Sequence, residues 1–174
     1  MIYKITINDF GKSMLEALEK LEAECYIKLS KYQKLILSEV ATVEQTLSII
    51  VGTPITIELV KQEETHHQQQ RSSRSTTPIM RREVWLKDAE GNRLIHAISK
   101  YQPRNLPGNI AADMGKGLIG IGTSIAKHEL PTCRKVIEIG YNRDSNTLHR
   151  EYCIISKQRT LFVIFEEFDA NLFT

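Results

Sequence analysis

Two charged side chains occupy strand-like segments at positions where apolar residues are expected. Arg82 alternates with apolar residues in the segment 80–86, and Glu166 does the same in the segment 161–168. Alternate side chains of a strand point to the same face of a sheet, so both charges are predicted to lie on apolar faces. Burying an unpaired charge costs roughly several kcal/mol, so each group requires a partner or a ligand.

A fixed guanidinium and a carboxylate within apolar walls would suit a small organic anion. A structural explanation competes with this one. In that explanation Arg82 and Glu166 form an ion pair with each other, or the two faces lie exposed at sheet edges. The residues alone leave both explanations open.

The bulk composition excludes several classes of protein. A length of 174 residues favours one domain spanning 1–174, and the net charge of +2 argues against a nucleic-acid partner. The sequence has no apolar run long enough for a membrane span, and its N-terminus lacks the apolar core of a secretory signal. The three cysteines are scattered without ligand spacing, which predicts reduced thiols and no metal site.

The first third of the chain is predicted to be mainly helical. Ser13 is expected to cap a helix reaching Cys25, within an N-terminal helical extension over 1–30. Further helices are expected at 32–37 and from Thr42 to Val51, the second ending at Gly52. The segment 62–78 has the composition of a long polar loop, and its His and Arg residues are interpreted as solvated.

The remaining pattern is that of antiparallel strands joined by short turns, with helices at 109–114 and 123–127. Together with an early strand at 55–59, the predicted strands number about six, at 80–87, 94–100, 136–139, 150–155 and 160–168. Helices packed on such a sheet make an α+β fold.

The glycine-rich segment 115–122 formally matches G-x-G-x-x-G. A dinucleotide site requires a preceding strand, but the residues before this segment have a helical pattern. We therefore interpret it as a close-packed loop whose glycines admit a ligand or a neighbouring backbone. Neither Cys133 nor His96 has neighbours in the sequence that indicate nucleophilic catalysis.

Four motifs in order resemble the chorismate lyase family, and in particular a short branch from cyanobacteria, archaea and red-algal plastid genomes. They lie at 82–86, 137–140, 150–154 and 164–168, and the likeness runs from about residue 30 to 169. The resemblance implies an α+β fold built on a six-stranded antiparallel sheet. It also implies conversion of chorismate to 4-hydroxybenzoate and pyruvate without a metal or an organic cofactor.

The resemblance also implies roles for individual residues. Arg82 would bind the ring carboxylate, and Glu166 would lie near the ring oxygen as a general acid or proton relay. Backbone contacts would come from Val43 and from either Ile119 or Ile121, because both isoleucines precede a glycine.

The chain departs from the family pattern at three places, one of which is an unusually long, polar loop at 66–77. Phe165 stands where a small residue is frequent, and Leu118 or Gly120 stands where proline is frequent. The alternative is therefore a non-catalytic domain of the same fold that binds a small aromatic acid. For the enzyme, the resemblance implies a monomer that makes a quinone precursor for ubiquinone or plastoquinone in the plastid stroma (chloroplast) or bacterial cytoplasm.

Overall fold

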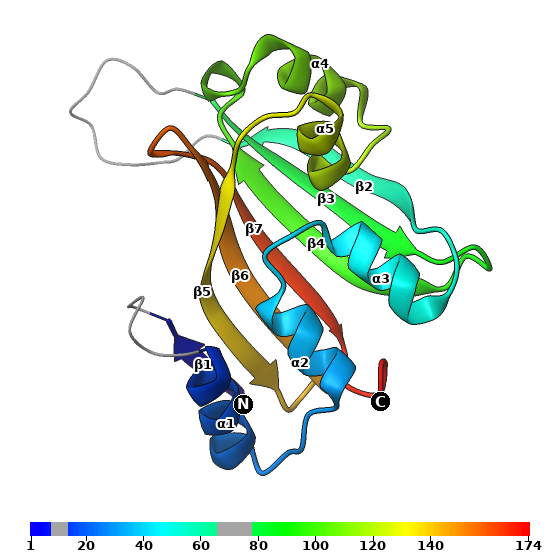
Figure 1. The fold of residues 1–174 in the computed structure, drawn as a ribbon, viewed down its shortest axis with the longest axis vertical. Helices are drawn as coiled ribbons and strands as arrows, with labels where there is room; N and C mark the ends of the chain where they lie inside the picture. The colour runs from blue at the N-terminus through cyan, green and yellow to red at the C-terminus, as the bar shows by residue number, and fades with distance from the viewer. Residues whose placement is uncertain (8–13, 66–77) are drawn as a thin grey trace.

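The computed structural model describes residues 1–7, 14–65 and 78–174, and its centre is one antiparallel sheet (Figure 1). The sheet has seven strands in the order β1-β5-β6-β7-β4-β3-β2. The strands are β1 (Ile2–Thr6), β2 (Thr56–Thr65), β3 (Ile79–Lys87), β4 (Arg93–Tyr101), β5 (Cys133–Asn142), β6 (Thr147–Ser156) and β7 (Arg159–Asp169).

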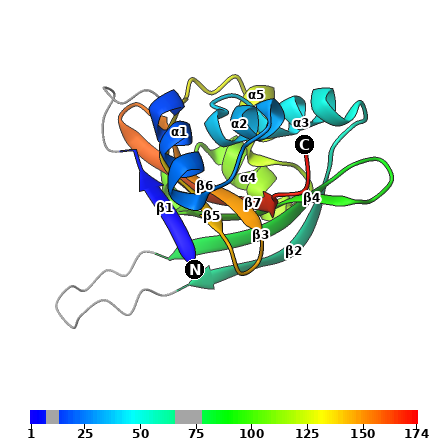
Figure 2. The same ribbon diagram turned by 90° about the horizontal axis from the view of Figure 1, so that it is seen from below.

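The helices gather on one face of this sheet, which therefore has a covered inner face and an open outer face (Figure 2). They are α1 (Met14–Cys25), α2 (Lys31–Ser38), α3 (Val43–Val51), α4 (Gly108–Lys116) and α5 (Ile121–Lys127), with a short 3-10 turn at Pro103–Asn105. The predicted α+β class is confirmed. Helices on one face and antiparallel strands beneath them are the arrangement that the alternating pattern requires.

The strand count differs from the prediction because β1 was not anticipated. Its five residues pair antiparallel with β5, with Ile5 opposite Ile139, so the expectation of a wholly helical segment over 1–30 is wrong. Ile5 is the one buried residue of this strand. A single inward side chain gives too little alternation to mark a strand in the sequence.

The polar loop also begins later than predicted. Residues 62–65 belong to β2 and pair with residues 79–82 of β3. This strand lies at the edge of the sheet and is largely exposed, so backbone pairing with β3 and not apolar alternation defines it. The remainder of the predicted loop, and Ser13, lie outside the described residues.

The register brings the two predicted charges to the same inner face. Arg82 lies opposite Ser99 of β4, while Glu166 lies opposite Ala97 of that strand. Directly opposed residues point to the same side of an antiparallel sheet, so Arg82 and Glu166 are separated by β4 and offset by two residues. Both face the helices.

Gly140 of β5 lies in close contact with the backbone of β1 and with a side chain of β6, its two neighbouring strands. A Cβ at this position would lie 2.3 Å from the Tyr3 carbonyl oxygen and 2.4 Å from Nε2 of His149. A contact this short with backbone forces the strands apart. Glycine inside a strand marks such a close approach.

We therefore predict that Gly140→Ala lowers the free energy of unfolding by about 1–3 kcal/mol, the usual cost of overpacking. Urea denaturation followed by circular dichroism measures this change. Gly115→Ala is the matched control, because a Cβ at Gly115 meets nothing within 4 Å and the residue lies in α4. Equal stability of Gly140→Ala and the wild type would contradict the packing described for this strand pair.

Candidate functional site

A cavity lies between the inner face of the sheet and the two segments that begin α3 and α5. Its free volume is about 40 Å³, which accommodates a few water molecules. The polar side chains that line the cavity are Glu44, Arg82, Ser99, Arg134, Tyr152 and Glu166.

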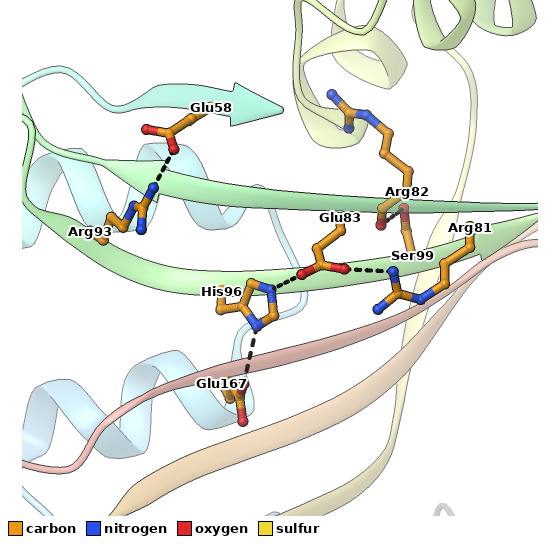
Figure 3. A network of polar contacts seen from close by, with 8 residues as sticks. All are labelled: Glu58, Arg81, Arg82, Glu83, Arg93, His96, Ser99 and Glu167. Carbon is orange, nitrogen blue, oxygen red and sulfur yellow. Dashed lines mark hydrogen bonds and ion pairs between the residues drawn. The ribbon is translucent and has the colours of Figure 1, made fainter. Parts of the chain in front are cut away.

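Arg82 is 2% exposed and extends from the inner face toward the α4–α5 end of the molecule (Figure 3). One terminal nitrogen donates to the carbonyl oxygens of Ile119, at 2.9 Å, and Gly117, at 3.3 Å. Its Nε is buried and has no hydrogen-bond partner. Burial lowers the pKa of the guanidinium from its usual value, and the charges of Tyr101 and Glu44 act in the opposite direction.

The neighbouring Arg81 points to the opposite face of the sheet (Figure 3). It forms an ion pair with Glu83 at 2.5 Å, and His96 bridges Glu83 and Glu167 at 3.0 and 3.1 Å. On this outer face Glu83 thus neutralises the charge of Arg81. No carboxylate among the described residues forms an ion pair with Arg82, so the two adjacent arginines have different environments.

Glu166 is 3% exposed, and its partner is Arg150, not Arg82. Its Oε2 accepts from Nε of Arg150 at 2.8 Å and lies 2.7 Å from a terminal nitrogen of that guanidinium. Its Oε1 accepts from the hydroxyl of Tyr152 at 2.9 Å. The alternative in which Arg82 and Glu166 form an ion pair is therefore wrong.

Arg150 completes this buried network. It is 1% exposed and also donates to the carbonyl oxygen of Glu39 at 2.7 Å. Burial alone would lower the pKa of Arg150, but the charge of Glu166 raises it overall. Sequence reasoning missed this arginine, although it alternates with Leu148 and Tyr152 in the same way as the two residues that were recognised.

The two isoleucines of the glycine-rich segment that were candidates for a ligand contact have different environments in the structure. Ile119 supplies the carbonyl oxygen that binds Arg82, whereas Ile121, and not Ile119, is among the residues that line the cavity. Helix α5 begins at Ile121, two residues before the predicted start. Val43, at the start of α3, is buried and also lines the cavity, while Thr42 precedes it without a side-chain cap bond.

A buried contact between α4 and α5 holds this segment in place. Asp113 accepts from the hydroxyl of Ser124 at 3.1 Å and lies 2.8 Å from Nε2 of His128. Among the described residues no hydrogen bond joins the Ser124 hydroxyl to the His128 imidazole, so the three groups lack the serine–histidine contact of a catalytic triad. This cluster positions the loop whose carbonyls bind Arg82.

Glu44 and Arg134 are cavity residues that sequence reasoning missed. The carboxylate of Glu44 lies against Gly120 and Gly122, where a Cβ on Gly120 would come within 1.7 Å of Oε1. Thr123 donates to the same oxygen at 3.1 Å. Burial raises the pKa of Glu44, and the negative charge of Glu166 adds to the increase.

Two classes of site have no support in the described part of the chain. No group of three or more His, Cys, Asp or Glu side chains is arranged to hold a metal ion there. Among the same residues, no helix combines the length and apolar character that crossing a membrane requires.

Comparisons with known proteins give both structural matches and a family match. The crystal structure of a chain described as a GntR-family transcriptional regulator is similar at 15% identity and a TM-score of 0.47, over 90% of this chain and 77% of that one. No curated protein matches. The family model described as chorismate pyruvate-lyase Rv2949c-like matches residues 41–174. The chain belongs to the Rv2949c-like chorismate pyruvate-lyase family, as its sequence motifs predicted.

Proposed function

We propose that the protein eliminates pyruvate from chorismate to give 4-hydroxybenzoate. The observation that carries the proposal is the buried guanidinium of Arg82, which lines the cavity with no carboxylate partner among the described residues. A guanidinium has five N–H donors in a planar fork. The carbonyls of Gly117 and Ile119 engage one terminal nitrogen, so donors remain for a ligand carboxylate.

A ligand carboxylate bound to Arg82 would supply the negative charge that this guanidinium lacks as a partner. Paired charged hydrogen bonds between arginine and a carboxylate are strong and directional. They would hold the ring carboxylate of chorismate at the Arg82 end and direct the opposite side of the ring toward Glu166.

The reaction requires little from the protein beyond this orientation. The bond between the ring and the ether oxygen breaks, and the hydroxyl-bearing ring carbon loses its hydrogen as a proton. The ring becomes aromatic, and the released enol takes up a proton to become pyruvate. No water, electron or group is added, so the atoms balance without a cofactor.

Glu166 would accept a hydrogen bond from the ring hydroxyl in this arrangement and relay to the released enol the proton that the hydroxyl-bearing ring carbon loses. Each of its oxygens already has protein partners, Arg150 and Tyr152, but a carboxylate offers about four acceptor positions. The Arg150 ion pair fixes the orientation of the carboxylate. The backbones of Val43 and Ile121 would complete the contacts with the ligand, as the resemblance implies.

A binding protein for an aromatic acid is the second candidate. The observation that favours it is that both oxygens of Glu166 already have protein partners, which makes the residue a better acceptor than proton carrier. Such a protein would bind 4-hydroxybenzoate and leave chorismate unchanged. In the lyase, 4-hydroxybenzoate would serve as a quinone precursor.

We predict that Arg82→Gln lowers kcat/KM for chorismate by about 10²-fold, because a buried charge-assisted pair is worth about 1.5–3 kcal/mol. Arg82→Lys should restore part of the loss. The measurement follows 4-hydroxybenzoate by chromatography and pyruvate by a coupled dehydrogenase assay. Arg81→Gln, which removes the same charge from the outer face, should retain wild-type activity.

If Arg82→Gln and Arg81→Gln have the same activity, the ring carboxylate does not bind at Arg82. If the wild-type protein binds 4-hydroxybenzoate in calorimetry but forms no product from chorismate, the binding protein is the correct assignment.

We predict that Glu166→Gln lowers kcat by about 10²-fold or more, the usual contribution of a positioned acid–base group. It should also lower the free energy of unfolding by about 3–5 kcal/mol, because Arg150 loses its buried counter-charge. Activity is therefore assayed at a temperature where circular dichroism shows a folded protein. Glu167→Gln, on the outer face, is the control. A folded Glu166→Gln variant with wild-type kcat would rule out a catalytic role for this carboxylate.

A further inference from the structure

A second arginine without a carboxylate partner lines the same cavity. Arg134 lies on β5, opposite Ile154 of β6, and its guanidinium donates to the carbonyl oxygen of Val40 at 3.3 Å. In the part of the chain that the structure describes, no carboxylate forms an ion pair with this residue. Arg134 is only half-buried, whereas Arg82 is fully buried.

The two arginines extend into the cavity from strands that lie far apart in the order of the sheet. Three strands, β6, β7 and β4, separate β5 from β3. Arg82 forms the closed end beneath the glycine-rich segment, and Arg134 lies beside the segment that leads into α3. A ligand between them would meet one cation at each end.

The other charged groups in and around the cavity do not fully offset the positive charges of Arg82 and Arg134. Arg150 and Glu166 neutralise each other through their buried ion pair. Glu44 is then the one lining carboxylate that opposes the two arginines, and its negative charge interacts with both. With the Arg150–Glu166 pair set aside as neutral, Arg82, Arg134 and Glu44 together carry one net positive charge when Glu44 is ionised and two when it is protonated.

The surroundings of Glu44 favour loss of its negative charge when an anion enters. It is packed against Gly120 and Gly122 of the glycine-rich segment, and Glu166 adds repulsion from β7. Arg82 on β3 and Arg134 on β5 are the cations that face it, and Thr123 on α5 donates a hydrogen bond. Burial raises the pKa of this carboxyl, and a bound anion beside it would raise that pKa further.

We propose that the cavity is built for a dianion, in which Arg82 binds a ring carboxylate and Arg134 binds a second carboxylate carried on an ether-linked side chain. This inference rests on the proposed function, because the substrate of that reaction carries both groups. It adds a specificity residue, since a cation at Arg134 favours the substrate over the aromatic product, which has a single carboxylate.

The test uses two stable ligands so that it does not depend on turnover. The dianion 3-(carboxymethoxy)benzoate carries a ring carboxylate and an ether-linked carboxylate, and 3-methoxybenzoate is the monoanion with the same ring and ether. Calorimetry gives Kd for each ligand with the wild-type protein, Arg134→Gln and Arg134→Lys. Arg93→Gln is the control, because it removes the same charge from an exposed ion pair with Glu58.

We expect Arg134→Gln to weaken dianion binding by about tenfold or more, the loss of one charge-assisted contact, and to leave monoanion binding within about twofold. Arg134→Lys should recover part of the dianion affinity, and Arg93→Gln should change neither Kd. Thermal melting confirms that each variant is folded. Equal weakening of both ligands, or unchanged dianion binding, would overturn the proposal.

The same data separate this inference from the proposed reaction. If the wild-type protein converts no chorismate but its preference for the dianion depends on Arg134, the dianion site stands and the lyase activity does not. If chorismate is converted and Arg134→Gln binds both ligands as the wild type does, the lyase stands and the second carboxylate site does not.

Discussion

The architecture of the cavity depends on a buried guanidinium that forms no ion pair with a carboxylate in the described part of the chain. Arg82 lies beneath the carbonyls of Gly117 and Ile119, and carbonyl dipoles compensate only part of a full charge. Positioning those carbonyls requires α4 to end at Gly117 in a left-handed conformation, with φ of +69°, and requires Asp113 to tie α4 to α5. The helices that cover this end of the sheet thus hold the carbonyl groups that contact Arg82. An anionic ligand would supply the negative charge that these carbonyls do not.

The other end of the cavity is organised differently. Glu166, Arg150 and Tyr152 form a closed, buried network in which each charge has a partner. Such a network is rigid because breaking one contact exposes an unpaired group in a dry environment. A ligand would therefore meet the under-compensated Arg82 at one end and, at the other, this neutral, fixed set of acceptors beside Arg134. This difference gives an anionic ring a preferred direction.

The sequence allowed accurate prediction of those features that depend on local alternation. The helix-covered, antiparallel class and the burial of Arg82 and Glu166 follow from periodicity within single segments. The partner of Glu166 could not be read in this way, because the contact with Arg150 depends on the register between β6 and β7. The same limit applies to β1, which pairs with residues more than 130 positions away, and to Arg134, whose neighbours come from distant strands and helices. The structure also gave separate contacts to Ile119 and Ile121, which spacing alone left as alternatives.

A crystal structure of the protein with 4-hydroxybenzoate tests the central claim most directly. We predict that the ligand lies in the cavity with its carboxylate within hydrogen-bonding distance of Nε and a terminal nitrogen of Arg82, and its hydroxyl directed toward Glu166. Ordered binding at another place, or a ligand in the cavity whose carboxylate does not contact Arg82, would contradict the role of this arginine as the anion-binding group.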